Sequence, residues 1–167
     1  MRGAMDGVVK FITHLGDEGY LWIAIGIVLL FWKKTRAIGA TVLVSLLLDY
    51  LIVNVTLKVL VARPRPYVVN KAIVPLVGGV SGYRSFPSGH SGGAFSAMSA
   101  VYRWVPKKIG IPALVLAALV ALSRLYVGVH YPTDIIAGCV IGFACSFVAK
   151  CLVQKILKKL EEKKVNG

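Results

Sequence analysis

Acidic residues are scarce in this sequence, which holds only seven Asp and Glu against 20 Lys and Arg in 167 residues. The resulting net charge of +13 is compatible with nucleic-acid binding. The basic residues, however, lie between apolar runs and near the C-terminal end, as they do in the cytoplasmic loops of membrane proteins. We therefore expect no nucleic-acid partner.

Cysteines are also few, and Cys139, Cys145 and Cys151 follow one another at six-residue intervals. Such a step turns a helix by about 240°, so the three side chains point to different faces. The odd count and this spacing match neither a disulfide framework nor a metal motif, and we expect free thiols. We expect no cleaved signal peptide either, because the first apolar run begins near Tyr20 and its positive cluster follows the run.

Apolar residues are abundant: they make up 57% of the chain, and the mean hydropathy is +0.74. Uncharged runs of nearly membrane-spanning length recur along the sequence, which predicts an all-α, polytopic membrane helical bundle with about five to six transmembrane helices. We expect one domain over residues 1–167, with a loop at 61–86 that is rich in Pro and Gly. The expected spans are 17–32, 37–60, 88–105, 109–127 and 133–153, with an interfacial helix at 1–16 and a basic cytoplasmic tail at 154–167.

The orientation in the membrane follows from the loops. With five spans, 12 Lys and Arg fall on the side of the C-terminal tail and eight on the other side. The positive-inside rule then places the tail in the cytoplasm and the N-terminus outside.

Several residues that are costly in lipid fall at the outer ends of these spans. Lys58 and Arg65 follow the second span, His90 begins the third, and Arg124 ends the fourth. His130 and Asp134 lie at the start of the fifth span. Four distant segments therefore bring cations, histidines and a carboxylate to one membrane surface.

This combination of residues suits a phosphate ester or anhydride. Lys58, Arg65 and Arg124 can neutralise phosphoryl oxygens, the two arginines in bidentate fashion. Ser88, Gly89 and the free amides at the start of the third span add neutral donors, and a helix N-terminus favours an anion.

The two histidines allow one nucleophile and one general acid. Asp134 follows His130 by four residues, so it can lie one helical turn away and hold the imidazole in the useful tautomer. Asp49 lies inside the second span, where an acid is a functional candidate. We favour a packing role for Asp49, as a protonated or hydrogen-bonded side chain.

The motifs resemble those of the type 2 phosphatidic acid phosphatase superfamily. That pattern is Lys, six residues, Arg-Pro; then Pro-Ser-Gly-His; then Ser-Arg, five residues, His, three residues, Asp. The chain matches it throughout, at Lys58, Arg65-Pro66, Pro87-Ser88-Gly89-His90, Ser123-Arg124, His130 and Asp134. Arg63-Pro64 is a second Arg-Pro pair with the wrong spacing, so we assign the family role to Arg65.

The resemblance implies a role for each matched residue. His130 would attack phosphorus and form a phosphohistidine, Asp134 would orient it, and His90 would protonate the leaving group. The phosphoryl group would be bound by Lys58, Arg65, Ser88, Gly89 and Arg124. The family works without a metal or other cofactor, and the single carboxylate of this site is a poor ligand set for Mg²⁺.

The expected substrate is a lipid phosphate or diphosphate in the bilayer. The small size resembles bacterial members acting on undecaprenyl diphosphate, which we favour, or on phosphatidylglycerophosphate or phosphatidate. The expected location is the bacterial cell (inner) membrane, with the site facing outside. Soluble acid phosphatases and vanadate haloperoxidases share the motifs, but the apolar spans argue against both.

Two other functions stay open. The phosphohistidine could pass its phosphoryl group to an alcohol, as in a lipid phosphotransferase, or the same cations could serve a non-enzymatic protein that binds anionic lipid. Each motif alone also has a plain structural explanation, such as a lysine snorkelling at a helix end or Pro-Ser-Gly-His starting a helix. The sequence does not determine the oligomeric state.

Overall fold

The computed structural model describes residues 3–78 and 83–165. Residues 1–2, 79–82 and 166–167 lie outside the described residues, and with them the ends of the expected interfacial helix and basic tail and part of the expected loop. Among the described residues the regular secondary structure is helical, apart from one isolated β-bridge between Pro64 and Arg84. The helices are α1 (Asp6–His14), η1 (Asp17–Gly19), α2 (Tyr20–Leu30), α3 (Arg36–Asp49), η2 (Tyr50–Leu57), α4 (Lys58–Val61), α5 (Pro66–Val69), α6 (Gly89–Tyr102), α7 (Lys107–Tyr126) and α8 (Pro132–Val165).

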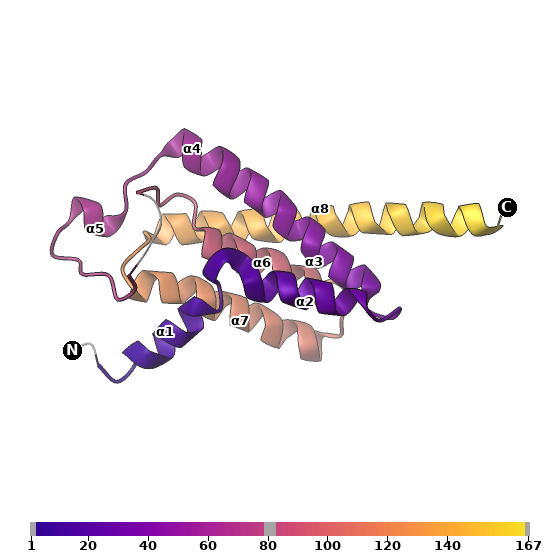
Figure 1. The fold of residues 1–167 in the computed structure, drawn as a ribbon, viewed down its shortest axis with the longest axis horizontal. Helices are drawn as coiled ribbons and strands as arrows, with labels where there is room; N and C mark the ends of the chain where they lie inside the picture. The colour runs from indigo at the N-terminus through magenta and orange to yellow at the C-terminus, as the bar shows by residue number, and fades with distance from the viewer. Residues whose placement is uncertain (1–2, 79–82, 166–167) are drawn as a thin grey trace.

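Helix α6 forms the centre of the bundle and packs against α3, α7 and α8 (Figure 1). Its small residues allow this, because Ala94, Ala97 and Ala100 are fully buried and small side chains let helix backbones approach closely. The backbones of α6 and α8 approach closely at two glycines: an added Cβ atom at Gly142 would clash with the carbonyl oxygen of Gly92, and one at Gly138 would lie 2.6 Å from the carbonyl oxygen of Ser88. The third expected span is therefore packed tightly against the fifth.

Within the part of the chain that the structure describes, three helical stretches are long and apolar enough to cross a membrane: Arg36–Val61, Lys107–Tyr126 and Pro132–Lys164. They coincide with the second, fourth and fifth expected spans. Helices α2 and α6 have 11 and 14 residues, fewer than the roughly 20 that a spanning helix needs. The membrane bundle is therefore confirmed, whereas the number of five spans stays a prediction.

Helix α8 runs without a break from Pro132 to Val165, through the basic tail. Figure 1 shows the C-terminal end of α8 extending beyond the bundle. The basic tail is thus a helical continuation of the fifth expected span. The expected loop at 61–86 contains one short helix, α5, which begins at Pro66, where proline suits the first helical position.

The second expected span is continuous but changes its winding. Residues Tyr50–Leu57 (η2) form a π-helix between α3 and α4. In a regular α-helix, Asp49 and Asn54 would lie about 140° apart. The wider i→i+5 winding places residues five apart on nearly the same face. Asp49, Asn54 and Lys58 consequently all line one cavity.

Candidate active site

A cavity of about 670 Å³ lies where α6 and α8 begin and α7 ends. Six of the eight residues expected in the site line it: Lys58, Arg65, Gly89, His90, Arg124 and His130. The other two, Ser88 and Asp134, are fully buried behind it. The expected convergence of distant segments on one end of the bundle is therefore found in the structure.

His130 lies in the turn between α7 and α8 and is only 5% exposed. Its Nδ1 is 3.4 Å from Oδ2 of Asp134, and its Nε2 is 3.5 Å from Nη1 of Arg65. A carboxylate can only accept and a guanidinium can only donate, so these neighbours favour a proton on Nδ1 and an unprotonated Nε2 whose lone pair faces Arg65. That tautomer presents Nε2 as a nucleophile.

The protonation state of His130 also suits a nucleophile. Burial lowers its pKa to about 4, and the positive charges of Arg65 and Arg124 act in the same direction, while the hydrogen bond with Asp134 opposes them. The imidazole is therefore neutral at pH 7, with a lone pair available for attack.

Asp134 has a second charged partner that the motif did not indicate. Nη1 of Arg63 lies 2.9 Å from Oδ1 of Asp134, and the same nitrogen donates to the Thr133 hydroxyl at 2.6 Å. The Arg63 guanidinium also stacks on the Tyr131 ring, 3.8 Å from its centroid. Sequence reasoning set Arg63 aside because of its spacing. No local pattern could have linked it to a residue 71 positions away.

The other cations of the cavity are held by neutral oxygens. Lys58 donates from Nζ to Oδ1 of Asn54 at 2.6 Å. Arg124 donates from Nη1 to the hydroxyl of Thr13 at 2.6 Å, and its Nε has no hydrogen-bond partner among the described residues. Oxygens that carry no charge leave the positive charge of both side chains available to an anion.

Ser88 is the N-cap of α6. Its hydroxyl oxygen accepts hydrogen bonds from the backbone N–H of Ser91 at 3.3 Å and from the Ser91 hydroxyl at 2.9 Å. Its own N–H donates to the carbonyl oxygen of Asp134 at 3.0 Å, which ties the start of α6 to the start of α8. The helix-start explanation of Pro-Ser-Gly-His therefore holds for Ser88, alongside the phosphate-binding role that the resemblance implies.

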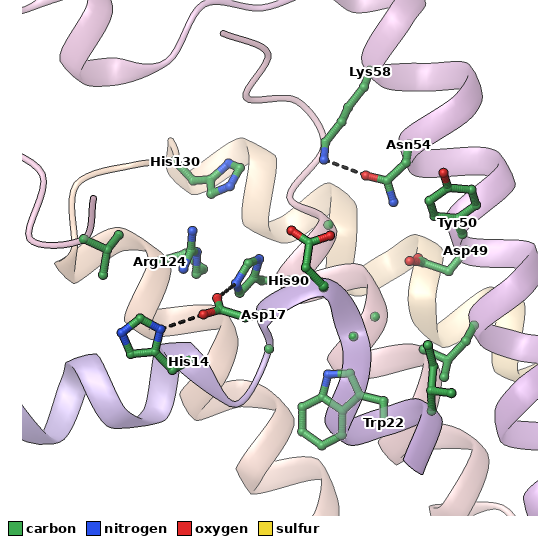
Figure 2. A pocket seen from close by; sticks show the side chains of 18 of the residues that line it. His14, Asp17, Trp22, Asp49, Tyr50, Asn54, Lys58, His90, Arg124 and His130 are labelled. Atoms are coloured by element: carbon green, nitrogen blue, oxygen red, sulfur yellow. Dashed lines mark hydrogen bonds and ion pairs between the residues drawn. The ribbon is translucent and has the colours of Figure 1, made fainter. Parts of the chain in front are cut away.

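His90 faces a carboxylate that the sequence did not single out. Its Nε2 lies 2.9 Å from Oδ1 of Asp17, and Oδ2 of Asp17 lies 2.6 Å from Nδ1 of His14 (Figure 2). Burial opposes ionisation of Asp17, but the hydrogen bonds with His14 and His90 outweigh it and hold the pKa of Asp17 below its usual range. His14 thus lies at the edge of the cavity.

One wall of the cavity is apolar. Its apolar lining residues are Trp22 and Ile23 on α2 and Leu43, Leu46 and Leu47 on α3. Asp49 also lines the cavity; it is 3% exposed, and its Oδ1 has no hydrogen-bond partner among the described residues. A headgroup can therefore meet cations at one part of the cavity while an apolar chain lies against the other.

No group of three or more His, Cys, Asp or Glu side chains is arranged to hold a metal ion within 3–78 and 83–165. Positive charge in the cavity comes instead from Lys58, Arg65 and Arg124. These side chains can stabilise charge on a phosphoryl group directly.

The chain is similar to known proteins in sequence and in fold. A family model described as "PAP2 superfamily" matches residues 38–158. The undecaprenyl-diphosphatase of Sulfolobus acidocaldarius is 34% identical over 145 residues, which are 87% of this chain and 69% of that protein.

Two crystal structures resemble the fold as well. The chain superimposes on LpxE of Aquifex aeolicus with a TM-score of 0.80 at 25% identity, covering 89% of this chain and 87% of that one. It matches a transmembrane PAP2-type phosphatidylglycerolphosphate phosphatase of Bacillus subtilis with a TM-score of 0.75 at 34% identity, covering 93% of this chain and 80% of that one.

Proposed function

This chain belongs to the PAP2 superfamily and is a membrane lipid phosphatase, and on that premise we propose that it cleaves its substrate through a phosphohistidine on His130. The observation that carries the proposal is the pair of contacts at His130, with Asp134 on Nδ1 and Arg65 on Nε2. They favour the tautomer whose free nitrogen faces the cationic cavity.

The proposed reaction has two steps. Nε2 of His130 attacks phosphorus, an N–P bond forms, and the bond from phosphorus to the leaving oxygen breaks while protonated His90 gives that oxygen its proton. In the second step His90 takes a proton from water, whose oxygen attacks phosphorus and breaks the N–P bond. Phosphate leaves, and both histidines return to their starting forms.

Charge stabilisation is assigned to side chains and backbone rather than to a metal. Lys58, Arg65 and Arg124 bind the phosphoryl oxygens, and Ser88 and Gly89 contribute neutral donors at the start of α6. Phosphate release that is unchanged by a metal chelator supports this assignment. Loss of release with the chelator, restored by a divalent cation, would contradict it.

The substrate is proposed to be a lipid phosphate or diphosphate, with undecaprenyl diphosphate first and phosphatidylglycerophosphate or phosphatidate next. The similarity to an undecaprenyl-diphosphatase supports this order. The apolar wall formed by Trp22, Leu43 and Leu46 suits a lipid chain that stays between α2 and α3 while its headgroup reaches the cations. A phosphate-release panel of purified protein over lipid monophosphates and diphosphates ranks these substrates.

Replacement of His130 tests the nucleophile. We expect His130→Ala to abolish turnover and to prevent formation of an acid-labile, base-stable phosphoenzyme from radiolabelled substrate. Asn70→Ala, at an exposed loop position, serves as the control and should retain both. Unchanged turnover in His130→Ala would contradict the mechanism, and absence of turnover in the parent protein would favour the lipid-binding alternative.

The phosphotransferase alternative starts from the same intermediate. Labelled substrate with an added alcohol acceptor distinguishes the two: hydrolysis yields inorganic phosphate, whereas transfer yields a phosphorylated alcohol. Transfer without phosphate release would contradict the hydrolase proposal.

We further propose that the protein is a single domain of the bacterial inner membrane, with the site facing outside and the tail of α8 in the cytoplasm. The distribution of Lys and Arg supports this orientation. In a variant whose native cysteines are replaced by Ala, Asn70→Cys should react from outside with an impermeant thiol reagent. Reaction only after permeabilisation would reverse the orientation.

A further inference from the structure

The turn between α1 and α2 brings a carboxylate to His90. Asp17 lies 2.9 Å from His90 through Oδ1 and 2.6 Å from His14 through Oδ2, so it joins the two histidines (Figure 2). This turn precedes residues 38–158, the part that the family model matches. The family motifs accordingly assign no role to Asp17.

The charges around His90 make such a partner chemically useful. A general acid must carry a proton when the leaving group departs. The charged and titratable groups that face His90 are Asp17 on the N-terminal turn, with His14 behind it, Arg124 on α7 and His130 before α8. His90 also lies in the first turn of α6, where the helix dipole disfavours a cation. Among the charged groups in this set, Asp17 alone is an anion and stabilises the imidazolium.

The turn is built to hold Asp17 against the ring. A Cβ atom at Gly16 would lie 2.7 Å from Cδ2 of His90, so the backbone of Gly16 lies close to the edge of the imidazole ring. Glu18 and Gly19 follow in the left-handed region, with φ of 49° and 72°, and reverse the chain into α2. Four residues before Asp17, the hydroxyl of Thr13 accepts from Arg124. The N-terminal segment thus contacts two residues of the proposed site.

We propose that Asp17 is the positioning residue for the leaving-group side of the reaction, accepting the Nε2 proton of His90, orienting its ring and stabilising its cationic form. Nδ1 of His90 is then the nitrogen that exchanges a proton with the leaving oxygen. His14 shares the carboxylate and lies at its exposed side. The inference rests on the proposed role of His90 as general acid.

The test compares two leaving groups. For Asp17→Asn we expect kcat to fall about ten-fold or more with a lipid monophosphate, whose alkoxide leaving group needs a proton. We expect less than about a three-fold loss with p-nitrophenyl phosphate, whose phenolate leaves without one. Asp17→Glu should recover part of the lipid activity. In Asp17→Asn the alkaline limb of the kcat profile should move to lower pH, because His90 loses its proton more readily.

The controls separate positioning from packing. Asp6→Asn removes another N-terminal carboxylate, whose Oδ1 accepts from the Tyr126 hydroxyl at 3.0 Å, and should leave the ratio of the two activities unchanged. The double variant Asp17→Asn, His90→Ala should be no slower than His90→Ala, because the two residues act as one unit. Thermal unfolding checks that each variant folds, and Asp17→Ser takes the place of Asp17→Asn if the amide does not fold.

Equal losses on both substrates, or none on either, would overturn the inference. A parent protein without phosphatase activity, or an active His130→Ala, would instead contradict the proposed function. If the parent is active, His130→Ala is inactive and Asp17→Asn equals the parent, the inference about Asp17 alone fails.

Discussion

Nη1 of Arg63 and Oδ1 of Asp134 lie 2.9 Å apart, although 71 positions separate the two residues in the chain. The other carboxylate oxygen faces His130 and also accepts from the backbone N–H of Tyr131 at 2.9 Å. Arg63 therefore completes the hydrogen bonding of the carboxylate that orients His130.

Arg63→Ala should lower kcat about ten-fold, the size typical of losing an outer partner of a functional histidine. Removal of the guanidinium leaves the fully buried Asp134 with fewer hydrogen bonds to hold its orientation. Steady-state phosphate release measures the effect. Lys71→Ala, an exposed basic residue of the same loop, is the control. Equal rates for Arg63→Ala and the parent would show that Asp134 needs no second partner.

Stability should fall in acid because of His130. Burial lowers its pKa to about 4, below the ordinary value of about 6.5 that it regains on unfolding. Between these values the unfolded chain binds more protons than the folded protein, so the free energy of unfolding rises with pH. The Tm measured by thermal unfolding should therefore fall as the pH is lowered from about 6.5 to about 4. The slope should be shallower in His130→Asn, and an unchanged slope would assign the effect to other groups.

Gly138→Ala should reduce both activity and thermal stability. The added Cβ would lie 2.6 Å from the carbonyl oxygen of Ser88, a backbone atom that cannot turn aside. Helix α8 must then move away from the start of α6, which separates His130 from His90. We expect a lower Tm and a loss of kcat of about ten-fold or more, since small displacements of reacting groups are costly. Gly7→Ala, whose Cβ meets nothing within 4 Å, should retain both, and a Tm in Gly138→Ala equal to that of the parent would contradict the packing argument.

Asn54→Ala should raise KM more than it lowers kcat. Its Oδ1 accepts from Lys58 at 2.6 Å and fixes the ammonium beside the cavity. Without this hydrogen bond the Lys58 side chain keeps its charge, but its ammonium group is no longer held in position. Binding of the headgroup should therefore weaken several-fold, as expected for loss of a charge-assisted hydrogen bond. Thr56→Val removes a hydroxyl that bonds only within the same segment, to the carbonyl oxygen of Leu51, and should match the parent. A change in kcat alone in Asn54→Ala would count against the binding role of Lys58.

Regular α-helical winding would place Asp49 and Asn54 on different faces of one helix, whereas the structure has both at the same cavity. The difference arises from the π-helical winding of Tyr50–Leu57. An α-helical projection assumes a constant 3.6 residues per turn. A single π-helical stretch changes the direction in which every later side chain points around the helix axis. No residue type in the sequence indicates where such a stretch occurs.

The N-terminal turn shows a second limit of sequence reasoning. His14 and Asp17 follow no motif, and their three-residue spacing suggests only a local pair. Their relation to His90 depends on how α1 and α2 fold back over the start of α6. The contact between Asp17 and His90 joins residues 73 positions apart and arises from the packing of helices. The helical periodicity of the sequence does not indicate such a contact.

The helical membrane character could be predicted from the sequence, and so could the motif residues that the structure brings to one cavity. Long apolar runs need backbone hydrogen bonds satisfied within a helix, and charges at helix ends must gather at a membrane surface. The neighbours of those residues could not be predicted in this way: Arg63 for Asp134, Asp17 for His90, Thr13 for Arg124. Such partners are chosen by the packing of helices distant in the chain, and hydrogen-bond geometry at about 3 Å is decided by that packing alone.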